Sequence, residues 1–259
     1  MITLTVLVAT GALVGFCIGL TGVGGGSLMT PILLMMGIPA PVAIGTDLLY
    51  ASITKAGSAL VHIRQRHVNK PILIALSLGS LPASLLTSHV LTLSSWHASS
   101  RLMTLTLAFM LSLTGISLLF KRRVLHTLPL QTSVPEDRIR RKDLILTCLT
   151  GAVLGVLVTL SSVGAGAIGV VVLLALHPRL RMINVIGTDV THAVLLTLVA
   201  GLGHWQAHHV DTRLLLSLSI AALPAMFLGI HLSSRTPDHW LRIMLGFMLI
   251  MVSGKFAFF

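Results

Sequence analysis

Two aspartates lie inside apolar stretches of this chain, and both follow the same three residues. The run Ile-Gly-Thr-Asp ends at Asp47 and returns ending at Asp189, whereas the other five of the seven acidic residues lie in or beside loops. A charged side chain inside a membrane span is costly and usually functional, so these carboxylates are candidates to carry protons or to order a site. The structural alternative is that each anion stabilises the start of its helix, which contributes about 0.3–1 kcal/mol.

The offset of 142 residues between the two aspartates also relates other positions, from Gly22 with Gly164 to Pro82 with Pro224. It predicts two copies of one structural unit, each with a glycine-rich break before a short apolar segment. The half-helix after such a break directs free N–H groups and its positive dipole end at whatever lies there, so two breaks that meet would bind an anion. Close packing of small residues is the structural alternative. The candidate residues are Gly22, Gly24, Gly25, Gly26 and Ser27 in the first break, and Ser161, Ser162, Gly164 and Gly166 in the second.

Further polar side chains accompany the aspartates. Lys55 follows Asp47 by about two helical turns, so it either pairs with a carboxylate or contacts an anion. His192 lies three residues after Asp189 on the same helical face and is a candidate proton relay or a packed histidine. The hydroxyls of Thr46 and Thr188 either bind an oxyanion or bond back to their own helices. The histidine spacing matches no strong zinc pattern, so we expect no metal and no cofactor.

The composition is that of a membrane protein. Of 259 residues, 54% are apolar and 10% are charged, against about 25% charged in a soluble domain. Several apolar runs reach the roughly 18–20 residues that cross a bilayer, which predicts an all-α polytopic membrane protein. The net charge of +11 lies mostly in short loops, as in cytoplasmic loops of membrane proteins, so it does not call for a nucleic-acid partner.

The chain divides at a hydrophilic linker. We expect a first membrane repeat at 1–120, a cytoplasmic linker at 121–142 and a second repeat at 143–259, each repeat with about five helical segments. The segments at 27–37 and 167–177 are too short to span a bilayer, so they are broken or re-entrant and meet at the midplane. An odd number of segments would invert the second repeat.

The basic residues favour that inversion. Fourteen of the eighteen lysines and arginines fall in the loops at 63–70, 121–142, 178–182 and 233–242, and three lie on the opposite side. Because cytoplasmic loops collect lysine and arginine, the linker is expected in the cytoplasm and the termini outside. Inverted repeats with paired short segments are typical of secondary transporters, whose binding site lies near the midplane.

These motifs together resemble the sulfite exporter TauE/SafE family of permeases. The resemblance covers nearly the whole chain and rests on four stretches: residues 19–27 followed by Pro31, Gly45-Thr46-Asp47 through Lys55, residues 162–166, and Gly187-Thr188-Asp189. It implies a multi-pass permease of the bacterial inner membrane that exports sulfite or small organosulfonates. Many family members have serine after Gly-Thr, and the aspartate in both copies here is typical of a distinct subgroup.

Three hypotheses follow. The first is a transporter of a small sulfur-containing anion by alternating access, with proton coupling left open. The second is a cation or metal transporter that uses Asp47 and Asp189 as ligands. The third, an intramembrane hydrolase with Ser27 as nucleophile, is disfavoured because Gly169 takes that position in the second copy and no acid–histidine pair lies nearby in the sequence. Membrane lipid is the other expected partner, and a homo-oligomer stays open.

Overall fold

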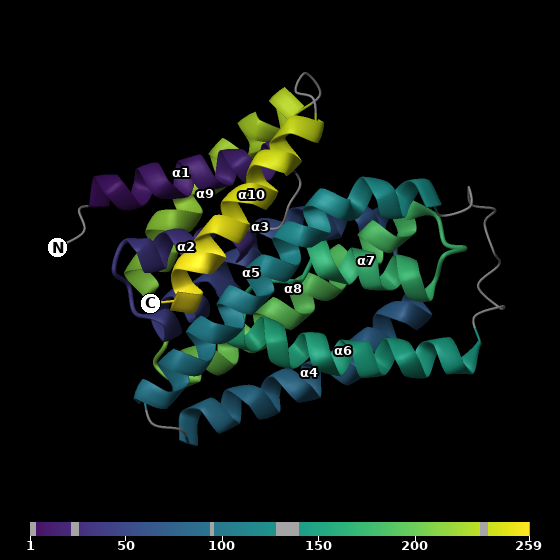
Figure 1. Ribbon diagram of the computed structural model, residues 1–259, viewed down its shortest axis with the longest axis horizontal. Helices are drawn as coiled ribbons and strands as arrows, with labels where there is room; N and C mark the ends of the chain where they lie inside the picture. The colour runs from purple at the N-terminus through teal and green to yellow at the C-terminus, as the bar shows by residue number, and fades with distance from the viewer. Residues whose placement is uncertain (1–3, 22–25, 94–95, 128–139, 234–237, 259) are drawn as a thin grey trace.

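Helices are the regular secondary structure of the chain wherever its structure is described. The computed structural model describes residues 4–21, 26–93, 96–127, 140–233 and 238–258. Within these ranges there are ten helices and no strand (Figure 1). The helices are α1 (Leu4–Thr21), α2 (Gly26–Met35), α3 (Ala40–Arg64), α4 (Lys70–Leu93), α5 (Trp96–Thr127), α6 (Arg141–Ser161), α7 (Ala167–Leu176), α8 (Met182–Gln206), α9 (Thr212–Ser233) and α10 (Asp238–Phe258).

Five of the described helices are long and apolar enough to cross a membrane. They comprise α4, the central part of α5, α6, α8 and most of α9. The predicted class, an all-α polytopic membrane protein, is therefore confirmed. Helices α2 and α7 have ten residues each, so each spans about 15 Å, half of a bilayer core.

Local sequence explains several helix ends. Pro39 precedes α3 and Pro41 lies in its first turn, where a missing N–H costs nothing. At the far end of α3, Arg66 adopts a left-handed conformation with φ of 58°, and His208 does the same after α8. Between α6 and α7, Ser162, Gly164 and Gly166 all have positive φ, which reverses the chain within five residues.

Helices α3 and α8 cross at the centre of the molecule and run antiparallel. The Ser52 hydroxyl donates to the Val194 carbonyl across 3.5 Å, and these two residues are 142 positions apart. On one side of this crossing Gly45 packs on His204 and His209, and on the other Gly187 packs on His62 and His67. Each contact therefore recurs with the two halves exchanged, which is the pattern expected of two halves related by a two-fold axis.

The halves are also interlocked through their first and fourth helices. Helix α1 packs along α9, where Gly11, Gly15 and Gly19 face the backbone of Leu218, Ala222 and Met226. Helix α6 packs along α4 in the same way, with Gly151 on Leu76 and Gly155 on Ser80. Glycine at these positions lets two backbones approach closely, which is how helices associate in lipid.

The helix ends fall on two sides of the molecule. Because α4 and α6 run parallel, α6 begins beside the start of α4, and the start of α8 lies against the end of α3. Helices α5 and α10 run antiparallel, since Ala108 contacts Ser253 and Gly115 contacts Gly246, so α10 begins beside the end of α5. Figure 1 shows α1 beginning and α10 ending at the edge opposite the start of α6.

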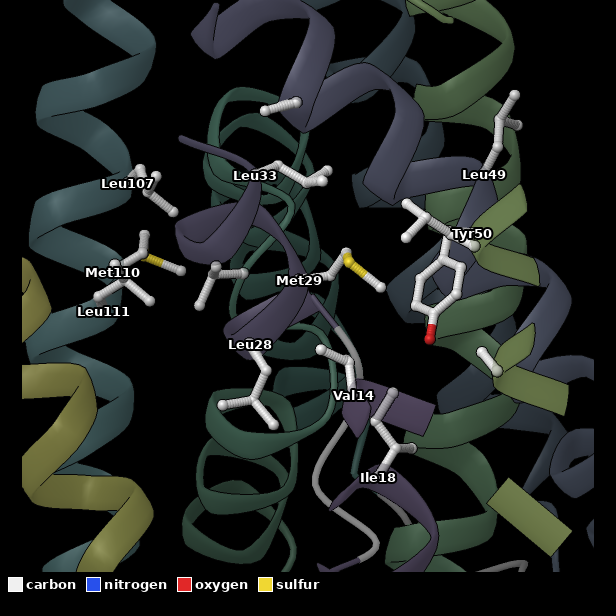
Figure 2. Close-up of a cluster of buried hydrophobic side chains, with 14 of the residues drawn as sticks. Val14, Ile18, Leu28, Met29, Leu33, Leu49, Tyr50, Leu107, Met110 and Leu111 are labelled. Atoms are coloured by element: carbon white, nitrogen blue, oxygen red, sulfur yellow. The ribbon is translucent and has the colours of Figure 1, made fainter. Parts of the chain in front are cut away.

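The largest apolar core surrounds the short helix α2. Figure 2 shows Met29 and Leu33 of α2 between Leu107 of α5 and Tyr50 of α3, and all four side chains are fully buried. Large apolar side chains cover much of the outer surface, including Leu13, Leu78 and Phe227. In a chain with several candidate spans, such side chains face lipid.

Candidate transport site

Asp47 lies fully buried on α3, next to α2. The Thr30 hydroxyl of α2 donates a hydrogen bond to its Oδ2, and Oδ1 has no hydrogen-bond partner among the described residues. The Ser162 hydroxyl, at the break between α6 and α7, lies near this carboxylate without forming a well-aligned hydrogen bond. Both halves of the chain thus contribute to the surroundings of Asp47.

Asp189 is also buried, on α8, but its surroundings differ from those of Asp47. Its carboxylate lies directly on Gly169 in the first turn of α7, where a Cβ would come within 1.9 Å of Oδ1. Only glycine leaves room for the carboxylate there. The positive end of the α7 dipole favours an anion at this place.

The side chain of Lys55 reaches the break between α6 and α7. Its partly buried side chain donates from Nζ to the Ala165 carbonyl at 2.8 Å, and a Cβ on Gly166 would lie 3.9 Å from Nζ. Its charge is attracted to both aspartates, and more strongly to Asp189 than to Asp47. The lysine therefore lies on the Asp189 side of the α3–α8 crossing.

The position three residues after each aspartate carries a different polar side chain in each half. His192 is buried, and its Nε2 lies 2.7 Å from the Ser80 hydroxyl of α4. Tyr50 takes the equivalent position after Asp47, and its hydroxyl has no hydrogen-bond partner among the described residues. Figure 2 shows this hydroxyl pointing away from Leu33 and Leu49, towards the level of Val14.

The predicted site residues are thus brought together in part. Asp47, Lys55, Asp189, His192, Ser162 and Gly166 surround the crossing of α3 and α8 or the adjacent break. Gly164 has a φ of 110° and its position is packed against Met110. Gly22, Gly24 and Gly25 lie outside the described residues, Gly26 begins α2, and Ser27 follows it in a part of the chain whose side-chain surroundings are not described.

Three predicted hydroxyls are engaged elsewhere. Thr46 accepts the Asp211 N–H at 3.1 Å, and Thr188 accepts the Asn69 N–H at 2.9 Å. Each hydroxyl therefore holds the loop between the third and fourth helices of the other half. Ser161 donates to its own helix at the Leu157 carbonyl.

Three polar contributors escaped the sequence reasoning: Thr30, Tyr50 and Ser80. Tyr50 had a signal, because it lies three residues after Asp47 as His192 does after Asp189. Thr30 and Ser80 had none, since hydroxyls are common in membrane helices and often bond their own backbone. No group of three or more histidine, cysteine or acidic side chains that could hold a metal occurs within the described ranges.

Known proteins resemble this chain over almost its whole length. It is 34% identical over 253 residues to the "Probable membrane transporter protein YjnA" of Bacillus subtilis (strain 168), covering 96% of this chain and 97% of the relative. It is 28% identical over 258 residues to a "Probable membrane transporter protein" of Xylella fastidiosa (strain 9a5c), covering 97% and 94%.

No solved structure shows significant similarity to the chain. The family model described as "Sulfite exporter TauE/SafE" matches residues 7–256. The relatives, the family match and the apolar helices agree that this is a multi-pass membrane transporter. The chain belongs to the sulfite exporter TauE/SafE family.

Proposed function

We propose that this transporter exports sulfite or a small organosulfonate from a bacterial cell across the inner membrane by alternating access. The observation that carries the proposal is the buried group of Asp47, Lys55 and Asp189 beside a short helix of each half. Charged groups inside a membrane protein mark a substrate or ion path. The family match supports the sulfur oxyanion as the cargo.

The two-fold arrangement supports alternating access. We take residues 1–120 and 143–259 as two repeats of opposite orientation in the membrane, joined by a cytoplasmic linker at 121–142. The antiparallel crossing of α3 and α8 and the exchanged contacts around it agree with this division. Rocking one repeat against the other would expose a central site first to one side and then to the other.

The substrate would bind at the breaks. The α7 end of the site offers the Ser162 hydroxyl and the Lys55 ammonium, and we place the anion's oxygens there. Thr46 and Thr188 were expected as further donors to the anion. Their hydroxyls instead accept hydrogen bonds from the loops of the other half, so we assign them a structural role beside the site. Proton coupling belongs to the proposal, because the carboxylates outnumber the lysine.

Efflux from proteoliposomes tests the proposal. Full-length protein with Lys55→Ala should fold but lose efflux of radiolabelled sulfite and methanesulfonate, because the positive charge of the site is gone. Lys255→Ala, which changes an exposed lysine near the end of α10, is the matched control and should keep the wild-type rate. Efflux that persists unchanged in Lys55→Ala would remove this lysine from the site.

A cation transporter is the second candidate, and the excess of carboxylates favours it. The described part of the site contains two carboxylates, Asp47 and Asp189, and one lysine, Lys55. Uptake of divalent metal ions by the same proteoliposomes, without any flux of sulfite or methanesulfonate, would decide for the cation.

A further inference from the structure

The charges at the α3–α8 crossing restrict how an anion can enter. With both carboxylates ionised, Asp47, Asp189 and Lys55 leave one net negative charge in a buried place. An anion added to this site would be repelled, and burial weakens the screening of that repulsion. The repulsion is relieved when one carboxylate takes up a proton.

The two carboxylates differ in what holds them ionised. Asp189 has the stronger attraction to Lys55 and lies at the positive end of α7. The Ser52–Val194 contact shows why: in an antiparallel pair, Lys55 lies beyond the crossing on the side of Asp189 and about 12 Å along α3 from Asp47. A proton on Asp189 would therefore remove the stronger of the two attractions that Lys55 experiences.

Asp47 can change its protonation state without such a loss. Its Oδ2 is bonded to the Thr30 hydroxyl, which can donate to a carboxylate or accept from a carboxylic acid. Its Oδ1 is buried and has no partner in the described part of the chain, so it is available to hold a proton. A proton on Oδ1 leaves the Thr30 hydrogen bond to Oδ2 intact, and a proton on Oδ2 requires only that the Thr30 hydroxyl rotate.

We propose that Asp47 is the residue that exchanges the coupled proton, while Asp189 stays ionised and Lys55 stays charged throughout the cycle. This inference rests on the proposed anion transport. A proton from one aqueous side converts the Asp47 carboxylate to the acid, the anion then binds, and the proton leaves on the other side with the anion. The polar groups near Asp47 are Tyr50 and Lys55 of α3, the Thr30 hydroxyl of α2 and the Ser162 hydroxyl of the second break. Asp189 and His192 of α8 lie close to Lys55.

The test separates exchange from net transport. Proteoliposomes containing the full-length protein are given labelled methanesulfonate, a permanently charged probe, first with equal concentrations on both sides and then with a pH gradient. Wild type should exchange the label and accumulate it along the proton gradient. Asp47→Asn, which imitates the protonated acid, should still exchange the label but lose accumulation, whereas Asp189→Asn should lose both.

Each remaining outcome contradicts a stated claim. Accumulation by Asp47→Asn, or loss of accumulation with intact exchange in Asp189→Asn, would overturn the inference. Wild-type exchange that no pH gradient can drive would overturn it too and leave anion transport standing. Absence of any wild-type flux of methanesulfonate and sulfite would overturn the proposed function and the inference with it.

A second pair of variants covers a misfolded Asp47→Asn protein. Thr30→Val removes the hydroxyl that Asp47 uses and should displace the pH at which accumulation is half-maximal. Thr54→Val is the matched control, because the Thr54 hydroxyl is equally buried on α3 but donates to its own helix at the Tyr50 carbonyl. An unchanged pH profile in Thr30→Val would count against Asp47 as the exchanging group.

Discussion

Tyr50 and His192 show how the two halves have diverged around a shared carboxylate. Both lie three residues after an aspartate, but His192 bonds Ser80 of α4, whereas Ala222 stands at the equivalent place on α9. The Tyr50 hydroxyl consequently has no matching partner there among the described residues. The surroundings of the two aspartates are therefore chemically different, although the contacts of the helices that carry them recur with the two halves exchanged.

His177 provides a pH-sensitive contact at the end of α7. It is buried, and its Nε2 lies 2.9 Å from the Thr147 hydroxyl of α6. Burial lowers the pKa of His177, and the charge of Asp143 partly opposes this effect. The folded protein therefore prefers the neutral imidazole. Its contribution to stability is complete above about pH 6.5, the unfolded value, and is lost as the pH falls from there through the lowered folded pKa.

His177→Gln should weaken this acid sensitivity, because glutamine can bond Thr147 without titrating. The midpoint of thermal unfolding in detergent, measured from pH 5 to pH 8, should fall less steeply below pH 6.5 than in wild type. Each kcal/mol corresponds to about 2–4 °C in a chain of this size. His89→Gln, at an exposed position of α4, should keep the wild-type slope. Equal slopes in all three proteins would show that titration of His177 does not contribute to the acid sensitivity of the protein.

The sequence revealed the charged residues of the site better than the neutral ones. Asp47, Asp189, Lys55 and His192 stood out because charged or titratable groups are rare in membrane spans. Hydroxyls carry no such signal, so the role of Thr46 and Thr188 in holding opposite loops was not predictable. That role depends on which loop packs on which helix, which is a property of the tertiary structure.

At the scale of helices, the molecule is held together by close backbone contacts between the halves. The first helix of each half lies along the fourth helix of the other, with glycines at the points of contact. Apolar burial gives no preference for protein over lipid, so such contacts depend on packing. The two halves therefore do not form separate bodies that fold side by side.

Gly15→Ala should destabilise the α1–α9 contact. A Cβ at Gly15 would lie 2.6 Å from the Ala222 Cα and 2.4 Å from its carbonyl oxygen, so the helices must separate. The cost of such overpacking is about 1–3 kcal/mol. Gly57→Ala is the matched control, because nothing lies within 4 Å of its Cβ, and it should be neutral or stabilise α3 by up to about 1 kcal/mol. Thermal unfolding in detergent measures both, and equal stabilities would show that α1 can shift freely on α9.

The repeat predicted which helices correspond, but not their register in every part. The contacts of α3 and α8 keep the offset of 142, whereas Gly11 and Gly151 make equivalent contacts and are 140 residues apart. The second half has one more residue than the first between its first two helices and one more after its short helix. Loops tolerate such insertions. One extra residue lies in the second break and the other in the loop before α8, so the offset of 142 does not extend to α1 and α6.

For the whole molecule, composition and repetition were enough to predict a polytopic helical protein with two short helices. They were not enough to pair the helices, because apolar faces in lipid look alike in sequence. The pairing of α1 with α9 and α4 with α6 became visible only through their contacts. The orientation of the chain in the membrane, which the basic loops predict, can be measured.

Gln65 and Ala207 test the inversion directly, because they are 142 residues apart and end α3 and α8 with nearly the same backbone, φ −80° and −79°. Single cysteines at these positions, in a chain with Cys17 and Cys148 replaced by alanine, should react with a membrane-impermeant thiol reagent from opposite sides. We expect Gln65→Cys to be labelled in inside-out vesicles and Ala207→Cys in whole cells, since basic loops remain cytoplasmic. Labelling of both cysteines from one side would mean that the repeats are parallel. Two parallel repeats could not open a central site to each side of the membrane in turn by exchanging their conformations.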